Sequence, residues 1–422
     1  MSLPSDPKRI LIPLSGLTAL IVWSVVSVVS SGCLGPTAIL NTRIRYNEVY
    51  RDTNDEQILL NIVRLRYADS PVFIDLPNIT SQFEWNGLAN YLGGFGNQAP
   101  GPASLGTGQL TIRDTPTISY HPRSGSEVAR ALLNPLSAEL FSVVNAGASI
   151  DQFMMLTVND INDIPNGSCA TTMLPRGPCD NLEFRHGIQL LAELEGRGVV
   201  ELTVRKLEDS DGSDPIPADK VGGGDLVAAT KEDYVFREGS DKRMTVHKLE
   251  KALVLRVRME DVDSAEMAEL ARIFRLKPGL PIYKIKSELS GDHPRRKLTD
   301  DLELQDTVYI NMRSILQVAI FLSKGVCVPE EHIVNGVAPS TTGYDGQIYD
   351  WTQLTDGLFR VCCQKCRPKD VEVTVPYRGY WFFISREDVS SRAAMAIIEI
   401  LFSVQESEGK PAGPLLSIPL GG

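Results

Sequence analysis

Apolar residues recur every three to four positions over several stretches of this chain, which predicts amphipathic helices. In the first stretch, Arg43 to Arg66, the stripe is Ile58, Leu59, Ile62 and Val63. Thr53-Asn54-Asp55-Glu56 has the residue order of a capping box. The other predicted helices are Glu127 to Leu133, Ala138 to Asn145, Ile150 to Asn159, Asn181 to Glu195, Ser264 to Phe274, Arg313 to Ser323 and Ser390 to Gln405.

Short runs of β-branched and aromatic residues between glycines and prolines predict the strands. Two sets of strands flank a glycine-rich loop between Gly87 and Leu110, which predicts a long hairpin. The strands before it are Val72 to Leu76 and Ile79 to Trp85, and the strand after it is Gln109 to Tyr120. The other predicted strands are Val199 to Arg205, Tyr234 to Arg237, Leu253 to Met259, Ile282 to Ile285, Phe359 to Cys363, Val371 to Pro376 and Tyr380 to Ile384, with Arg378-Gly379 as a tight turn.

These elements predict an α+β fold, with N-terminal helices and a long β-hairpin followed by a C-terminal antiparallel sheet covered by helices. The predicted organisation has four parts. They are a signal peptide in residues 1–32, a helical region with the glycine-rich hairpin in 33–165, an α/β region with an acidic loop in 180–290, and a C-terminal α+β region in 297–422.

The N-terminus carries the strongest targeting signal. Lys8 and Arg9 precede an apolar run from Ile10 to Val29, and Ser30-Ser31-Gly32-Cys33 follows it. This order resembles a bacterial lipobox, which implies diacylglycerol on Cys33, cleavage before it and acylation of the new amino terminus. An uncleaved anchor is the alternative, because the apolar run has roughly the ~20 residues that span a bilayer. Leu34 after the cysteine resembles lipoproteins sorted to the outer membrane, facing the periplasm.

Composition and charge limit the kinds of partner that we expect for this protein. The chain has 422 residues, of which 43% are hydrophobic and 23% charged, as in ordinary globular proteins. Removing Asp6, Lys8 and Arg9 with the signal changes the formal net charge from -11 to -12. An acidic body without a long basic run argues against nucleic-acid binding. The membrane would be reached through the lipid anchor rather than through surface charge.

The cysteine count favours disulfides in the oxidising compartment that the N-terminal signal implies. Beside Cys33 there are six, an even number that favours disulfides: Cys169, Cys179, Cys327, Cys362, Cys363 and Cys366. Cys169 and Cys179 bracket a turn-rich loop that a local disulfide would close. Cys363-Gln-Lys-Cys366 could instead be half of a zinc site or a redox pair, although no second pair stands at zinc-ribbon spacing. Pairs among the last four cysteines are not predictable from the sequence.

Catalytic signatures are missing from the sequence. None of the five histidines stands in an H-E-x-x-H arrangement, and there is neither a nucleophile elbow nor a phosphate-binding loop. We therefore expect no enzyme, no cofactor and no metal. Tyr91, Leu92 and Phe95 are apolar residues among the hairpin glycines, and we expect them to contact a partner.

Three sequence segments are similar to a group of uncharacterised bacterial lipoproteins of this length. They are Gly32-Cys33-Leu34-Gly35-Pro36 together with Tyr46-Asn47 and Glu56 to Tyr67, Pro116-Thr117-Ile118-Ser119-Tyr120, and Tyr377-Arg378-Gly379-Tyr380-Trp381-Phe382. This resemblance implies an acylated Cys33 and brings no known activity.

The function expected from all this is a lipid-anchored, non-enzymatic cell-envelope protein of structural or adaptor type. The alternatives are an extracytoplasmic enzyme or small-ligand binder with a site assembled from scattered residues, and a subunit of an oligomeric envelope complex. An oligomeric pore would need strict apolar-polar alternation over ~10-residue strands, which Ile79 to Trp85 and Gln109 to Tyr120 do not show clearly.

Overall fold

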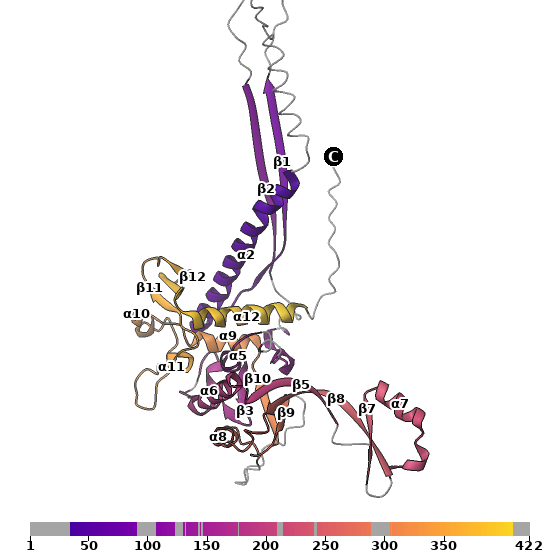
Figure 1. The fold of residues 1–422 in the computed structure, drawn as a ribbon. Helices are drawn as coiled ribbons and strands as arrows, with labels where there is room; N and C mark the ends of the chain where they lie inside the picture. The colour runs from indigo at the N-terminus through magenta and orange to yellow at the C-terminus, as the bar shows by residue number, and fades with distance from the viewer. Residues whose placement is uncertain are drawn as a thin grey trace, which may run out of the picture. The chain divides into compact units, whose positions relative to one another are not determined.

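The computed structural model of the protein describes residues 34–90, 107–122 and 130–407, with interruptions at 131, 142–143, 145–146, 176, 209–213, 240–242, 288–303 and 305. The chain divides into two compact units, Met1–Ile58 and Leu59–Gly422. The fold is α+β, as the sequence predicts. It contains a mixed sheet of eight strands, a three-stranded antiparallel sheet and a two-stranded hairpin (Figure 1).

The first described element is helix α2 (Leu34–Arg66), which begins earlier than the sequence predicts. The capping box predicted at Thr53 is wrong, because this residue lies inside the helix. Its hydroxyl donates to the carbonyl oxygens of Val49 and Tyr50, at 2.8 and 3.0 Å. A threonine inside a helix satisfies its hydroxyl in this way, so the same residue order occurs without a helix start.

The hairpin consists of β1 (Ile74–Asn90) and β2 (Thr107–Pro122), which pair antiparallel. The two strands predicted before the loop are one strand, with an irregularity between Asp75 and Asn78. From Asn78↔Ser119 to Asn90↔Thr107 the register has no further shift. The predicted partner-contact residues Tyr91, Leu92 and Phe95 lie outside the described residues.

The mixed sheet has the strand order β4-β3-β10-β9-β8-β5, with β6 and β7 also paired to β8. Its strands come from all three regions that the sequence distinguishes after the signal. Their bounds are β3 (Val158–Ile161), β4 (Ile164–Pro165), β5 (Val200–Glu208), β6 (Ile216–Pro217), β7 (Tyr234–Glu238), β8 (Arg243–Val257), β9 (Ile282–Ser287) and β10 (Thr307–Met312).

Strand β10 is absent from the sequence prediction. It pairs antiparallel with β3 and parallel with β9, so it lies inside the sheet. Thr307, Val308, Tyr309, Ile310 and Met312 are all buried. A strand covered on both faces has no apolar-polar alternation, and this is the reason that periodicity does not reveal it.

The helix caps agree only in part with the prediction. Ser264 Oγ accepts from Met267 N, which confirms the cap predicted there, whereas the capping box of Ser314 with Gln317 is not among the predicted caps. Ser149 precedes a helix as predicted, but its hydroxyl donates to Asp151 instead of capping. The helices are η1 (Ala138–Phe141), α5 (Ile150–Thr157), η2 (Ser168–Thr171), α6 (Leu182–Gly196), η3 (Ala218–Lys220), α7 (Gly223–Lys231), α8 (Ala265–Ile273), α9 (Ile315–Ser323), α10 (Glu330–Val334), α11 (Thr352–Thr355) and α12 (Val389–Ser407).

Three further predictions need correction. Of the predicted helix over 138–145, residues 138–141 form a 3₁₀ helix, η1, and residue 144 is α-helical, while α5 stops at Thr157 because the chain continues directly into β3. The acidic segment Glu208 to Gly224, predicted as a loop, contains β6 and η3 and the start of α7.

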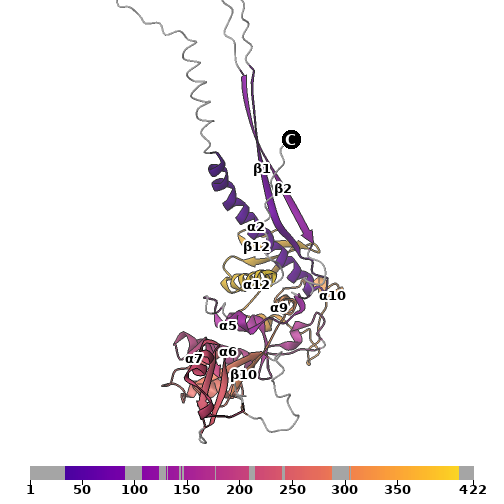
Figure 2. The same cartoon turned by 90° about the vertical axis from the view of Figure 1, so that its right-hand side faces the viewer.

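The three-stranded sheet has the order β11-β13-β12, with β11 (Cys362–Gln364), β12 (Val371–Tyr377) and β13 (Tyr380–Ser385). Arg378 and Gly379 have φ angles of 45° and 83°, so the predicted tight turn is confirmed. Helices α5, α9 and α12 pack on one another (Figure 2). In α12 the predicted apolar positions Met395 and Ile398 are buried.

No helix among the described residues is both long enough and apolar enough to cross a membrane. The predicted signal region and Cys33 lie outside the described residues.

Candidate functional site

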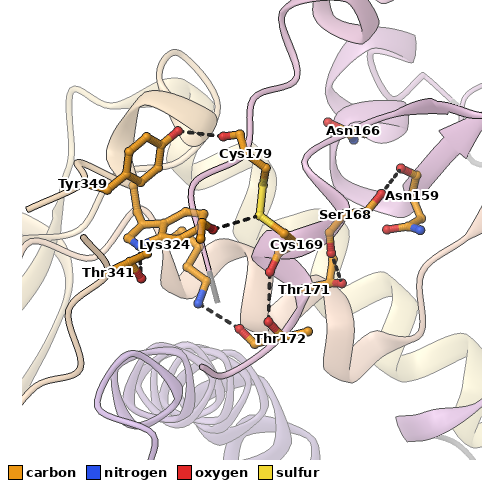
Figure 3. Close-up of a disulfide and its surroundings, with 12 residues drawn as sticks. Asn159, Asn166, Ser168, Cys169, Thr171, Thr172, Cys179, Lys324, Thr341 and Tyr349 are labelled. Carbon is orange, nitrogen blue, oxygen red and sulfur yellow. Dashed lines mark hydrogen bonds between the residues drawn. A yellow bond between two sulfur atoms is a disulfide. The ribbon is translucent and has the colours of Figure 1, made fainter. Parts of the chain in front are cut away.

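Cys169 and Cys179 form a disulfide, the pairing that the sequence predicts (Figure 3). The bond closes the turn-rich segment after η2. Tyr349 Oη donates to the Cys179 carbonyl oxygen at 2.6 Å, which links this segment to the loop that precedes α11. The disulfide therefore holds a surface segment in place, and the groups around it are those of a structural bond.

Lys324 lies beside this segment and is almost completely buried, with 3% of its surface exposed. Its ammonium donates to the Thr172 carbonyl oxygen at 3.0 Å and lies 5.3 Å from the centre of the Trp351 ring (Figure 3). Burial lowers the pKa of Lys324 to about 7. The sequence does not predict this buried cation, because a lysine directly after an apolar helix is usually a solvated charge at the helix C-terminus.

A second pair of sulfur atoms lies in contact without a bond. Cys363 Sγ is 3.3 Å from Cys327 Sγ, although the two residues are far apart in the sequence. Strand-like pairing brings them together, because Val326 bridges Val361 and Cys327 N donates to Val361 O at 2.9 Å. Cys327, Cys362, Cys363 and Cys366 are free thiols in the structure.

The two thiols have different acidities. Cys327 has its pKa lowered to about 6, chiefly because it accepts a hydrogen bond from Cys363, with the positive charges of Arg360 and Arg66 adding to the effect. The pKa of Cys363 is raised, because it is the donor to that sulfur and is partly buried. Cys327 is therefore the more acidic thiol of the pair.

The cysteine pair lies next to an aromatic cluster that joins the end of α2 to α10 and the three-stranded sheet. The Tyr67 hydroxyl and His332 Nδ1 share a buried hydrogen bond of 2.7 Å. The ring of Tyr67 also packs edge to face on Tyr377 and Phe382. Burial raises the pKa of Tyr67, with the neighbouring Cys363 thiol adding to the effect.

The rim of this cluster is charged. Asp69 accepts hydrogen bonds from the Tyr377 hydroxyl and from Arg378, which lower the pKa of its carboxyl. The Arg378 guanidinium lies 5.5 Å from the centre of the Tyr67 ring. Arg66 donates to the Pro339 carbonyl oxygen at 3.0 Å. Arg66 and Arg378 thus bond to or stack on groups of the protein itself, which is a structural role for both arginines.

A polar cleft of about 420 Å³ shares Arg360 with the surroundings of the cysteine pair. Its lining includes Asp350, Asp356, Arg360 and Asp388. Ser391, buried behind the cleft, accepts from Arg360 N at 2.8 Å and donates to Asp388. The lining offers carboxylates and one guanidinium to a ligand, and among its hydroxyls that of Thr352 donates to Asp350 Oδ1 at 2.7 Å.

The chemistry open to this region is that of a thiolate–thiol pair, which can be converted to a disulfide by a two-electron oxidant. Among the described residues, no group of three or more His, Cys, Asp or Glu could hold a metal ion. Comparisons with protein-family models, with curated proteins and with solved structures find no match.

Proposed function

We propose that this protein is a lipid-anchored cell-envelope component of structural or adaptor type, held by Cys33 and facing the periplasm from the outer membrane. The supports are the N-terminal pattern, the acidic body and the Cys169–Cys179 disulfide, which persists in oxidising compartments. The resemblance to uncharacterised bacterial lipoproteins agrees with this location. The proposal includes no catalytic role and no cofactor.

The observation that carries the adaptor part is the hairpin. Its strands have 17 and 16 residues and form a two-stranded sheet. Isolated two-stranded sheets are at best marginally stable in water. A ribbon of this length is therefore best explained as an element that meets a partner.

Acylation is tested by labelling cells with palmitate and comparing wild type with Cys33→Ser. We expect label in the wild type alone, and envelope fractionation of the wild type with the outer membrane. Equal labelling of the two proteins would remove the lipid anchor. Membrane association without label in either would favour an uncleaved anchor instead.

The adaptor role is tested separately by cross-linking in intact cells. The wild type should give discrete protein adducts that a variant with Asn78 to Thr117 replaced by a short polar turn does not give. Identical adducts from both proteins would show that the hairpin does not contact the partner.

Thiol–disulfide exchange is a second candidate function, favoured by the 3.3 Å contact of Cys327 and Cys363. Glutathione disulfide is a suitable oxidant. The Cys327 thiolate would attack one sulfur of the oxidant and release one glutathione thiolate. The Cys363 thiol would then lose its proton, attack the mixed disulfide and release the second glutathione, leaving a Cys327–Cys363 bond. Peptide mapping after exposure to glutathione disulfide should find this bond, and its absence would remove the candidate.

A further inference from the structure

The pairing of β1 and β2 sorts the hairpin residues into two unlike faces. Residues opposite each other in an antiparallel pair share a face, and successive residues alternate between faces. On one face, from Asn78↔Ser119 to Asn90↔Thr107, every residue except Leu88 is polar. The other face carries the bulky apolar residues, namely Ile79, Phe83, Trp85, Leu110, Ile112 and Ile118.

This alternation is hard to see in either strand alone, because Ser81, Gly87, Gly108 and Pro116 dilute the apolar face. The apolar face is recognised only when the pairing register places the residues of the two strands opposite each other. The hairpin is therefore amphipathic along its whole regular length, which is the pattern of a sheet with one covered face.

The aromatic residues and the charge on the apolar face favour a protein partner for the hairpin over insertion into lipid. Phe83 and Trp85 are central in the paired length, and Asp114 lies directly opposite Phe83. Strands that face lipid carry their aromatic residues near the two membrane interfaces and rarely carry a charge between them. Tryptophan and phenylalanine at the centre of a patch are typical of protein interfaces.

The two edges of the hairpin differ in how readily they can pair with a further strand. Pro116 lacks an N–H, so it fits the pair Ser81↔Pro116 only where the backbone groups point away from the partner strand. A proline in that place removes a donor from the outer edge of β2, which protects that edge from further pairing. Strand β1 has no proline between Asn78 and Asn90 and carries a single charge there, Glu84.

We propose that β1 pairs along this open edge, antiparallel, with β1 of a second copy of this chain. This inference rests on the proposed function, since it names the partner of the hairpin. Two ribbons joined in this way form a four-stranded sheet, and three or more strands with an apolar face are the usual minimum for independent stability. No second sequence is needed, because a two-fold axis pairs the strand with itself.

The alternation of apolar and polar residues also limits the register in which the two copies of β1 can pair. Only a two-fold axis that passes through a residue position keeps the apolar residues of both copies on one face, since a shift by one residue moves them all to the other face. An axis at Trp85 places Glu84 opposite Asn86 of the second copy and so avoids two opposed carboxylates.

The test uses the full chain, purified from membranes in detergent, and follows its oligomeric state by sedimentation over a range of concentrations. Ser81→Pro removes the outward N–H of β1 at the position opposite Pro116. Ser81→Ala is the matched control, because it keeps the N–H, and Asp114→Pro places the same change on the edge that we expect to be unused. Wild type, Ser81→Ala and Asp114→Pro should dimerise alike, and Ser81→Pro should dimerise at least about ten-fold more weakly.

A photoreactive amino acid at Phe83 supplies a second readout in intact cells, where the expected adduct has twice the mass of the chain. Equal dimerisation of Ser81→Pro and wild type, a monomer at all concentrations, or adducts only with lipid or with an unrelated protein would each overturn the proposal. Circular dichroism and the Cys169–Cys179 bond report folding of each variant. Palmitate labelling and fractionation are measured in the same cells, so that failure of the envelope location is seen independently of failure to dimerise.

Discussion

Single residues in this protein carry most of the coupling between distant parts of the chain. Tyr67 is 4% exposed and contacts His332, Tyr377 and Phe382, so one phenol ring joins the end of α2 to α10 and to the three-stranded sheet. Arg313 is fully buried, donates to the carbonyl oxygens of Met155, Leu156 and Asn166, and lies 3.9 Å from the centre of the Phe321 ring. These contacts explain why charged and polar side chains are tolerated in the core.

The thiolate of Cys327 is testable by its reactivity. In reduced protein, the rate of Cys327 alkylation by iodoacetamide should reach half its maximum near about pH 6, following the lowered pKa. Cys363→Ala removes the hydrogen-bond donor and should move the midpoint towards the ordinary value of about 8.5. Cys366→Ala, at an exposed cysteine, is the control and should leave the profile unchanged. An identical midpoint in wild type and Cys363→Ala would show that the contact does not set the acidity.

Lys324 gives a pH-dependent prediction for stability. Its pKa is about 7 in the folded protein and about 10.4 when unfolded, so between these values the unfolded chain binds the extra proton. Raising the pH from about 7 to about 10 should therefore increase the contribution of Lys324 to the free energy of unfolding, by at most about 3.5 kcal/mol.

The variant Lys324→Met isolates this effect. It should stabilise the protein by about 1–3 kcal/mol near pH 7 and by less near pH 10, since no cation is buried and the exposed Thr172 carbonyl can bind water. Denaturant unfolding of both proteins at several pH values gives the comparison. Lys365→Met, on an exposed lysine, controls for the loss of a charge. A destabilised Lys324→Met at every pH would show that the ammonium contact is worth more than its burial costs.

Elements differ in how far the sequence reveals them, and the difference is physical. Ser264 and Arg378-Gly379 are local signals, and both are confirmed because a cap or a turn depends only on its neighbours. Strand β10 depends on strands from elsewhere in the chain and has no periodicity of its own. The Cys169–Cys179 pair is local and predictable, whereas Cys327 and Cys363 meet only through the bridge between Val326 and Val361. The sequence therefore identifies both cysteines of the candidate redox site but not their pairing, and it does not reveal the two faces of the hairpin.

A substitution at Gly325 tests how the segment after α9 positions Cys327. A Cβ at this residue would collide with the Phe359 carbonyl oxygen and come within 2.8 Å of Thr355 Oγ1. Because backbone cannot yield as a side chain does, Gly325→Ala should lower the free energy of unfolding by about 2 kcal/mol. It should also weaken the Cys327–Cys363 contact, seen as a higher midpoint for Cys327 alkylation.

Gly224 is the control glycine for the substitution at Gly325. It lies in α7 with nothing near its virtual Cβ, so Gly224→Ala should be neutral or stabilising by up to about 1 kcal/mol. Equal stability changes in the two variants would show that the close approach at Gly325 is relieved without cost.

On the scale of the whole molecule, one sheet gathers strands from residues 158 to 312, so the regions separated by the sequence share a core. The three-stranded sheet and the hairpin form no strand pairs with this sheet, so the described strands are divided among three sheets.

Location, oxidation and stability can be tested together through the Cys169–Cys179 bond. In the chain-entropy account, a disulfide that closes so short a loop stabilises the folded state by perhaps ~2–3 kcal/mol, chiefly by restricting the unfolded chain. Protein isolated from the envelope should contain the linked peptide under non-reducing conditions. The same chain made without residues 1–33 stays in the cytoplasm, where thiols are kept reduced, and should lack the bond.

The stability difference follows from that contrast. The envelope form should unfold at a higher denaturant concentration than Cys169→Ser/Cys179→Ser, and added reductant should abolish the difference. Cys366→Ser, at an exposed and unbonded thiol, should match the wild type with and without reductant. Both thiols open to alkylation in freshly isolated envelope protein would contradict the bond, and with it one of the supports for an oxidising location. A bond that forms equally in the leaderless protein would separate the two questions, because the disulfide would then be set by the fold and not by the compartment.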